Sequence, residues 1–250
     1  MENNGNNENI IKNNYMSYID TSKYKIEELD KETDEENIDL SYKVIVIGDP
    51  YVGKTSIVQS LINKDNSLQN YKATIGFDIS NYYAKINEKK IRLKLWDTCS
   101  LIDFNSVTKN LFHDTSLAII VFSVDEKDSF THLTNWINLA KSNSGADLQL
   151  IIVGNKIDLE RKVTEDDINK FKSENNIDFY IETSVKENKF VKEVFENVLV
   201  LLYEKNKKDE NNEEQKREDL TRKSNQNESK SFNLKKEKNK NKNKKKKCNC

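Results

Sequence analysis

The 250-residue chain has one proline, three cysteines and two histidines, and it lacks any long apolar run. A membrane-spanning helix needs about 18 apolar residues in a row, so none is expected. Two of the cysteines, Cys248 and Cys250, stand at the end of the chain, which leaves too few for a disulfide framework. His113 and His132 lack the spacing of metal ligands, and no zinc site is expected. Without a signal-peptide-like run either, the sequence suggests a cytosolic, reducing location.

Positive and negative charges balance in total, with 41 Lys and Arg against 42 Asp and Glu, but they are segregated along the chain. Residues 1–41 are rich in Asn and Glu, and we expect a disordered acidic extension there. Residues 205–250 carry the stretch KKEKNKNKNKKKK, and we expect a flexible polybasic tail. Residues 42–204 have the composition of one compact domain.

Within 42–204, apolar strand-like runs alternate with helical patterns, which favours an α/β fold. Tyr42–Gly48, Leu117–Val124 and Leu148–Gly154 are nearly continuous apolar runs, as expected of parallel strands covered on both faces. The alternating segment Ile91–Asp97 and the preceding Phe77–Ile86 predict a hairpin across the turn NEKK.

Three helices are also predicted. Asp128 or Ser129 could cap a helix that runs to about Lys141, and Thr164 precedes an acidic first turn. A helical stripe near the end of the domain contains Val191, Val194, Phe195, Val198 and Leu202.

The first binding motif is GDPYVGKT, Gly48 to Thr55, which fits G-x-x-x-x-G-K-[ST]. It follows a predicted buried strand and opens a predicted helix, so backbone N–H groups can surround a polyphosphate. Lys54 would neutralise the phosphates and Thr55 would bind Mg²⁺. The alternative is a glycine-rich turn with a chance lysine. Pro50 removes one N–H, but donors remain; the residues assigned to phosphate binding are Asp49, Tyr51, Val52, Gly53, Lys54, Thr55 and Ser56.

A second motif, GNKID at Gly154 to Asp158, suggests which base is bound. The Asp158 carboxylate can accept from the two N–H groups of a guanine edge, a pair that adenine lacks, and Asn155 can meet the opposite edge. Lys156 can lie over the ring. The segment ETSVK adds a backbone N–H for the guanine oxygen, with Ser184, Val185 and Lys186 assigned to the site. A plain surface loop is the alternative for NKID, but three motifs at strand ends favour a nucleotide site.

With these motifs, residues 42–204 resemble a Ras-superfamily small GTPase, the Rab branch in particular. YKATIGFDI is similar to the first Rab switch, RLKLWDT to the strand before the second, and the terminal CNC to a doubly prenylated ending. The resemblance implies a P-loop NTPase fold: a six-stranded, mostly parallel sheet with strand 2 antiparallel and about five helices. It further implies that GTP, GDP and Mg²⁺ bind, that Lys54 and Thr74 are catalytic, and that Thr55, Thr74 and Asp97 serve the metal, Asp97 through water.

The chain departs from this family where hydrolysis is controlled. The family pattern D-T-A-G-Q-E is replaced by Asp97-Thr98-Cys99-Ser100-Leu101-Ile102. Ser100 stands in place of the glycine that contacts the γ-phosphate, and Leu101 in place of the glutamine that orients the attacking water. Unaided GTP hydrolysis is therefore expected to be slow. Asp103 could substitute at a shifted position, or an activating protein could supply the missing glutamine.

The resemblance also implies partners: an exchange factor, an activating protein, effectors, a prenylation escort and a GDP-dissociation inhibitor. The aromatic triad that Rab effectors engage corresponds here to Ile79, Trp96 and Leu111, which could equally be core residues. Prenylation at Cys248 and Cys250 with the lysine run predicts anchoring to the cytoplasmic face of a Golgi or endosomal membrane, with a cytosolic pool. The protein is expected to be monomeric and to bind no nucleic acid. The alternative is a pseudo-GTPase scaffold that does not hydrolyse nucleotide.

Overall fold

The structure is a computed structural model that describes residues 10–13, 16–29, 37–62, 74–99 and 111–217. The chain divides into two compact units, Met1–Tyr203 and Glu204–Cys250. The first unit contains the complete sheet and every residue of the candidate site described below.

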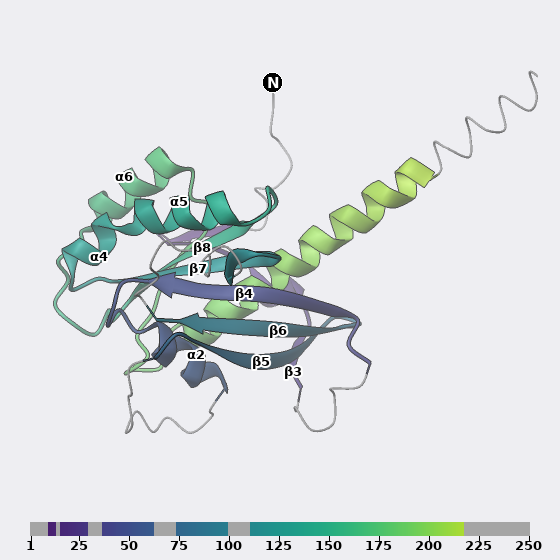
Figure 1. The fold of residues 1–250 in the computed structure, drawn as a ribbon, viewed down its shortest axis with the longest axis horizontal. Coiled ribbons are helices and arrows are strands. Elements are labelled where there is room, and N and C mark those ends of the chain that lie inside the picture. Colours follow the sequence, from purple (N-terminus) through teal and green to yellow (C-terminus); the bar gives the residue numbers. More distant parts are fainter. Residues whose placement is uncertain (1–9, 14–15, 30–36, 63–73, 100–110, 218–250) are drawn as a thin grey trace, which may run out of the picture. The chain divides into compact units, whose positions relative to one another are not determined.

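A nine-stranded sheet forms the centre of the first unit, in the order β1-β2-β9-β8-β7-β4-β6-β5-β3 (Figure 1). Six adjacent strands are those expected from the sequence, and only β5 among them runs antiparallel. The predicted α/β fold with an antiparallel second strand beside a parallel group is therefore confirmed, whereas the predicted count of six strands is too low because three more strands extend the sheet. The six expected strands are β4 (Leu40–Gly48), β5 (Phe77–Ile86), β6 (Lys89–Thr98), β7 (Thr115–Ser123), β8 (Gln149–Asn155) and β9 (Tyr180–Glu182).

Three further strands come from the acidic extension: β1 (Ile10–Asn13), β2 (Met16–Ile19) and β3 (Ile26–Glu28), with the 3-10 helix η1 (Thr21–Lys23) between the last two. The strand β2 pairs with β9, and β3 pairs with β5, so the extension covers both edges of the six-stranded sheet. The expectation of a disordered extension is wrong for these segments. The strand β1 pairs with the neighbouring β2, whereas β2 and β3 are joined to the sheet by strands far along the chain.

The extension is also fixed to the end of the domain. The backbone N–H of Ile19 donates to Asn197 Oδ1 over 2.6 Å in a buried position. The ring of Tyr24 lies edge-on to that of Tyr203, with centroids 6.3 Å apart. A buried backbone N–H needs such a partner, so Asn197 holds β2 in place.

Helices cover both faces of the sheet (Figure 1). One apolar layer includes α2 (Lys54–Ile62) and the helical residues 191–203, whose predicted stripe is fully buried. The other layer includes α4 (Lys127–Thr131), α5 (Leu133–Asn143) and α6 (Glu165–Asn175). The sheet is thus the middle layer of three.

Of two helix caps predicted from the sequence, one is confirmed and one is wrong. Thr164 caps α6 through a capping box with Asp167, as expected from the acidic first turn. The helix predicted to be capped by Asp128 or Ser129 instead starts at Lys127, after Glu126 at the N-cap, and is interrupted at His132. Ser129 is buried, and its hydroxyl donates to the Glu126 carbonyl and accepts from the Ser123 N–H, so it cannot act as the cap.

The hairpin between β5 and β6 is confirmed, with a shorter turn than expected. Ile86 pairs with Lys89, so only Asn87 and Glu88 form the turn. Asn87 adopts a φ of +52°, a left-handed conformation that asparagine tolerates better than most residues. Lys89 and Lys90 belong to β6.

In the second unit, residues 204–217 are helical, although residues from 205 onward were predicted to be flexible. Ion pairs between Glu204 and Lys207 and between Glu213 and Arg217 match helical spacing and favour this conformation. Within the described part of the chain, no helix has the length and apolar character needed to cross a bilayer.

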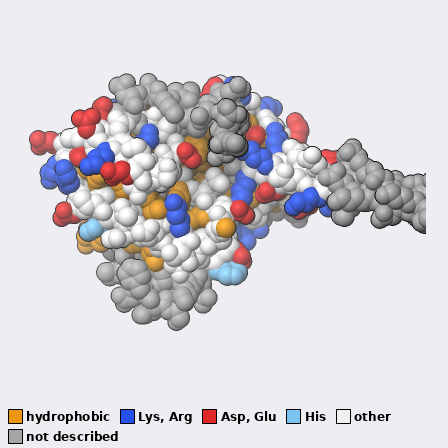
Figure 2. Space-filling view, turned by 90° about the horizontal axis from the view of Figure 1, so that it is seen from above, with side chains coloured by type: hydrophobic (Ala, Val, Ile, Leu, Met, Phe, Trp, Pro, Cys, Tyr) orange, Lys and Arg blue, Asp and Glu red, His pale blue; other side chains and the backbone are white. Residues whose placement is uncertain are grey.

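One face of the described residues carries charges of both signs. On the face shown in Figure 2, acidic and basic side chains lie among one another, with hydrophobic side chains between them. Elsewhere, Ile75 is 95% exposed, and Phe77 and Ile79 are about half exposed. Ile75 precedes β5, and Phe77 and Ile79 lie at its beginning.

Candidate functional site

The loop between β4 and α2 has a backbone conformation that its glycines permit. Gly53 has a φ of +98°, and a Cβ there would lie 2.2 Å from Asn155 Nδ2. Gly48 has a φ of +143° and packs against the backbone of β7, where a Cβ would meet the Val121 carbonyl oxygen at 2.1 Å. Tyr51 adopts a φ of +62° without being a glycine, and its side chain is 86% exposed. The loop therefore stands at the carboxyl end of β4 in a curled form that can present N–H groups to an anion.

Lys54 lies inside this loop. Its side chain is buried, and Nζ donates to the carbonyl oxygens of Gly48 at 3.0 Å and Asp49 at 2.8 Å. Burial lowers the pKa of Lys54 to about 8, although the charges of Asp97 and Asp49 act in the opposite direction. A buried cation with a lowered pKa is suited to an anionic ligand, because the ligand would restore its charge.

Three side-chain oxygens meet next to Lys54. Thr55 Oγ1 donates to Asp97 Oδ2 over 2.6 Å and lies 2.7 Å from Thr74 Oγ1. Thr74 Oγ1 also donates to Asp97 Oδ2, at 3.3 Å. The structure thus brings together three residues that are separated by up to 42 positions and that the sequence assigned to Mg²⁺.

Asp97 has the character expected near a hard cation. Its Oδ1 is buried and has no hydrogen-bond partner among the described residues. Burial raises the pKa of Asp97 despite hydrogen bonds from Thr55 and the charge of Lys54. An unsatisfied buried carboxylate oxygen beside two hydroxyls fits a Mg²⁺ site, because Mg²⁺ binds oxygen ligands and the waters around it can donate to that oxygen.

The residues that the sequence assigns to the base lie together at the carboxyl ends of β8 and β9. Ser184 Oγ donates to Asp158 Oδ1 over 2.6 Å, and Lys186 Nζ lies 3.6 Å from Asp158 Oδ2. Burial acts to raise the pKa of Asp158, but these partners outweigh it, and the pKa lies below its usual value. Asp158 is therefore held as an oriented carboxylate. Lys156 follows β8 with a φ of +65°.

Asn155 has a structural role that the sequence analysis missed. It is 2% exposed, its Nδ2 donates to the Val52 carbonyl at 2.9 Å, and its Oδ1 accepts from Thr183 Oγ1 at 3.0 Å. The side chain thus joins the phosphate loop to the base-binding strands. The second hydrogen of its amide group is left over for a ligand, so contact with a base stays a prediction.

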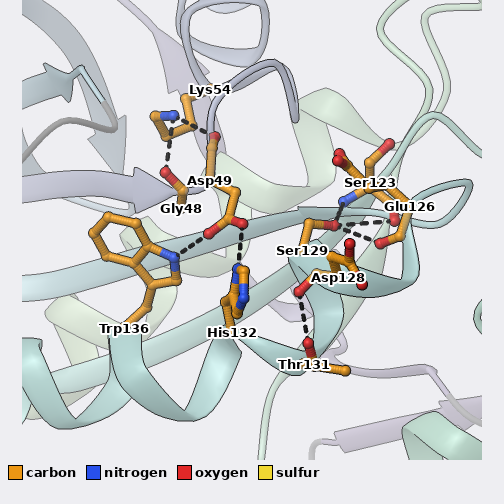
Figure 3. A network of polar contacts seen from close by, with 10 residues as sticks. All are labelled: Gly48, Asp49, Lys54, Ser123, Glu126, Asp128, Ser129, Thr131, His132 and Trp136. Atoms are coloured by element: carbon orange, nitrogen blue, oxygen red, sulfur yellow. Dashed lines mark hydrogen bonds and ion pairs between the residues drawn. The ribbon is translucent and has the colours of Figure 1, made fainter.

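A second connection, also missed, joins the loop to α5 (Figure 3). Asp49 Oδ1 accepts from Trp136 Nε1 at 2.6 Å, and Asp49 Oδ2 lies 2.6 Å from His132 Nδ1. His132 and Trp136 are four residues apart in an amphipathic segment, a spacing that places both side chains on the same face of a helix. This spacing was the sequence pattern from which a shared partner could have been inferred. Nothing in the sequence alone indicated that Asp49 would be their partner.

The remaining sequence assignments have mixed outcomes. Val52 is buried, and Ser56 and Val185 are partly buried beside the site. Of the effector-triad positions, Ile79 is 46% exposed, Trp96 stacks on Phe77, and Leu111 is buried in the core. Ser100, Leu101, Asp103, Cys248 and Cys250 lie outside the described residues.

Comparison with known proteins agrees with this geometry. The family model described as the Ras family matches residues 43–204. The Ras-related protein Rab-2B of Dictyostelium discoideum is 33% identical over 157 residues, which cover 62% of this chain and 77% of that protein. The matched residues contain the phosphate loop, the oxygen cluster and the base-binding motif. The chain therefore belongs to the Ras superfamily of small GTPases and is Rab-like.

Proposed function

We propose that the protein binds GTP and GDP with Mg²⁺ and acts as a membrane-anchored molecular switch in vesicle trafficking. The single observation that carries the proposal is the meeting of Lys54, Thr55, Thr74 and Asp97 at the sheet edge that also presents Asp158. Phosphate, metal and base ligands at one edge of an α/β sheet are typical of a nucleotide site.

Each part of the site has a distinct task. The N–H groups from Tyr51 to Ser56 and the Lys54 ammonium hold the β- and γ-phosphates. Thr55 and Thr74 would bind Mg²⁺ directly and Asp97 through water, and the metal would neutralise charge between the phosphates. Thr74 directly precedes Ile75, which is exposed. Binding of Thr74 to the γ-phosphate would therefore reorganise an exposed surface.

Base selection rests with Asp158. Ser184 and Lys186 orient its carboxylate, which accepts from the two N–H groups of guanine, while Lys156 lies over the ring. Adenine presents the N1 acceptor where guanine presents the N1–H donor, so it gives this carboxylate no donor pair. GTP is therefore favoured over ATP.

The experiment that tests this function is competition for a fluorescent GDP analogue. GTP and GDP should displace the analogue, whereas ATP should fail at a thousandfold higher concentration, since a site built for one donor pattern rejects its absence by about 10⁴. Asp158→Ala should weaken guanine binding strongly, and Asp178→Ala serves as the control because Asp178 lies away from the site on the exposed surface. Equal competition by ATP and GTP would refute the assignment.

Hydrolysis without help is proposed to be weak, because Ser100 and Leu101 replace the glycine and glutamine that serve the attacking water in the family. An activating protein that supplies a glutamine and an arginine would restore turnover. The same replacement supports a second candidate, a pseudo-GTPase scaffold that holds nucleotide without hydrolysing it. Single-turnover assays with and without activating proteins separate the two candidates.

Membrane attachment is proposed through prenyl groups on Cys248 and Cys250, assisted by the lysines of 235–247 at anionic lipid headgroups. The cytoplasmic face of the Golgi or of endosomes is the proposed location, with a cytosolic pool held by a GDP-dissociation inhibitor. An exchange factor and effectors complete the proposed cycle.

A further inference from the structure

Three atoms of Asp49 make contacts that link the loop between β4 and α2 to α5 and to Lys54 (Figure 3). Its two carboxylate oxygens face Trp136 Nε1 and His132 Nδ1, each at 2.6 Å. Its backbone carbonyl oxygen accepts from Lys54 Nζ at 2.8 Å. One residue thus joins α5 to the lysine that would neutralise the phosphates.

The loop needs such an anchor because its backbone is unusual. Pro50 has a fixed φ, and Tyr51 holds a φ of +62° that residues with a Cβ rarely adopt. The Tyr51 ring is 86% exposed, so packing of this ring contributes little to holding the conformation. On one side of Tyr51 the loop is fixed by the Val52 carbonyl, which accepts from Asn155, and on the other side by the Asp49 carboxylate. Strained backbone persists only where its surroundings fix it.

His132 makes the anchor sensitive to protonation. Its side chain is 51% exposed, and the charged groups that face it are Asp49 from the loop, Asp128 from α4 and Glu126 at the α4 N-cap. The hydrogen bond to Asp49 raises the pKa of His132 above its usual value, and the two other acidic groups add to this. The ion pair with Asp49 is therefore complete at low pH and is lost as the pH rises through the raised pKa.

We propose that Asp49, His132 and Trp136 form a latch that positions the phosphate loop and makes the rate of nucleotide release increase with pH. The inference rests on the proposed nucleotide-binding function. When the latch weakens, the loop can relax from the conformation in which Tyr51 presents its N–H, and the bound state becomes less populated. His132 and Trp136 are positioning residues, since they act through Asp49.

The test uses the full chain loaded with fluorescent GDP and Mg²⁺, with release measured between pH 5.5 and 8.5 after adding excess GDP. Deprotonation of His132 should make wild type release nucleotide about two- to fivefold faster at pH 8.5 than at pH 5.5. This is the range that a half-exposed ion pair can supply. His132→Gln should lose that component. His113→Gln, which changes the other histidine of the chain and its contact with Asp114, should keep the wild-type profile. Any titration of Lys54 is common to all three proteins and cancels in the comparison.

Trp136→Phe tests the second donor, because it removes the N–H and keeps a ring. Release should become about tenfold faster at every pH, the size expected for a hydrogen bond to a charged group, while the pH dependence from His132 remains. Thermal unfolding of each variant checks that the fold is intact. A release rate for Trp136→Phe equal to that of wild type would overturn the role of Trp136 as a positioning residue.

A spectroscopic measurement examines the latch without relying on release rates. The imidazole of His132, titrated by NMR, should show a pKa that falls toward its usual value in Asp49→Asn. If wild type binds no labelled GDP, the proposed function is wrong. If it binds GDP but His132→Gln keeps the full wild-type pH profile, the latch is wrong while the proposed function stands.

Discussion

At the scale of single residues, Lys54 carries a proton whose binding depends on the ligand. Burial lowers the pKa of Lys54 to about 8 when no phosphate is bound. The negative charge of bound phosphates would raise this pKa. The bound state then holds more protons than the free state above pH 8, so nucleotide affinity is greatest below this value and falls as the pH rises through it. Calorimetry in buffers of different ionisation enthalpy should detect proton uptake on binding at pH 8.5. Uptake that is absent at both pH 6 and pH 8.5 would contradict the prediction.

Leu101 offers a second prediction at this scale. Ser100→Gly combined with Leu101→Gln should raise single-turnover GTP hydrolysis by at least roughly tenfold, or about 1.4 kcal/mol, because it restores a group that orients the attacking water. GTP affinity should change little, since Lys54 and Thr55 are untouched. The control is Leu101→Asn, which is polar but shorter than glutamine. Brisk turnover by wild type, equal to that of the double variant, would show that another residue orients the water.

Single residues also show how far the sequence alone could reach. Lys54, Thr55 and Asp158, which the motifs assign to one site, lie at the same edge of the sheet, because motif spacing reports local strand-to-loop-to-helix geometry. Their binding of nucleotide stays a prediction. The roles of Asn155 and Asp49 in fixing the loop were missed, since both contacts join segments about 85 to 105 residues apart. Such contacts depend on how elements pack, which no local pattern records.

At the scale of elements, the extension strand β2 depends on one amide. Asn197→Ala would leave the buried N–H of Ile19 without its partner, and it should reduce the free energy of unfolding by about 1 to 3 kcal/mol. Urea denaturation measures this change. Asn138→Ala on the exposed part of α5 is the matched control and should change stability by less than about 0.5 kcal/mol.

The same strand explains why the extension was misjudged while the central strands were not. Residues 42–48, 117–124 and 148–154 are apolar enough to identify themselves as buried strands. The segments Met16–Ile19 and Ile26–Glu28 are short, and they lie in an Asn- and Glu-rich region whose average composition indicates disorder. Their places in the sheet depend on pairing with β9 and β5, which are far along the chain. Likewise, the interruption at His132 has no proline or glycine beside it in the sequence, and the contact of its side chain with Asp49 joins residues 83 positions apart.

At the scale of the whole molecule, the proposed anchor is separate from the nucleotide-binding domain. Replacing Cys248 and Cys250 by Ser should move the protein from the membrane fraction to the cytosol, because a lysine run without lipid chains gives only weak, salt-sensitive attachment. Nucleotide affinity should remain unchanged, which controls for misfolding. Fractionation at low and high salt measures the shift. Full retention of the double variant on membranes at high salt would mean that a protein partner holds it there.

The hydrogen bond between Ile19 and Asn197 has a consequence for biosynthesis. Its two partners are 178 residues apart, so at typical elongation rates β2 leaves the ribosome roughly ten to forty seconds before its amide partner exists. Until Tyr180–Glu182 has been made, β2 has no β9 to pair with. Closure of the sheet edge at β9 therefore has to wait until most of the chain has been synthesised, and a nascent chain stalled before Tyr180 would leave β2 exposed to chaperones.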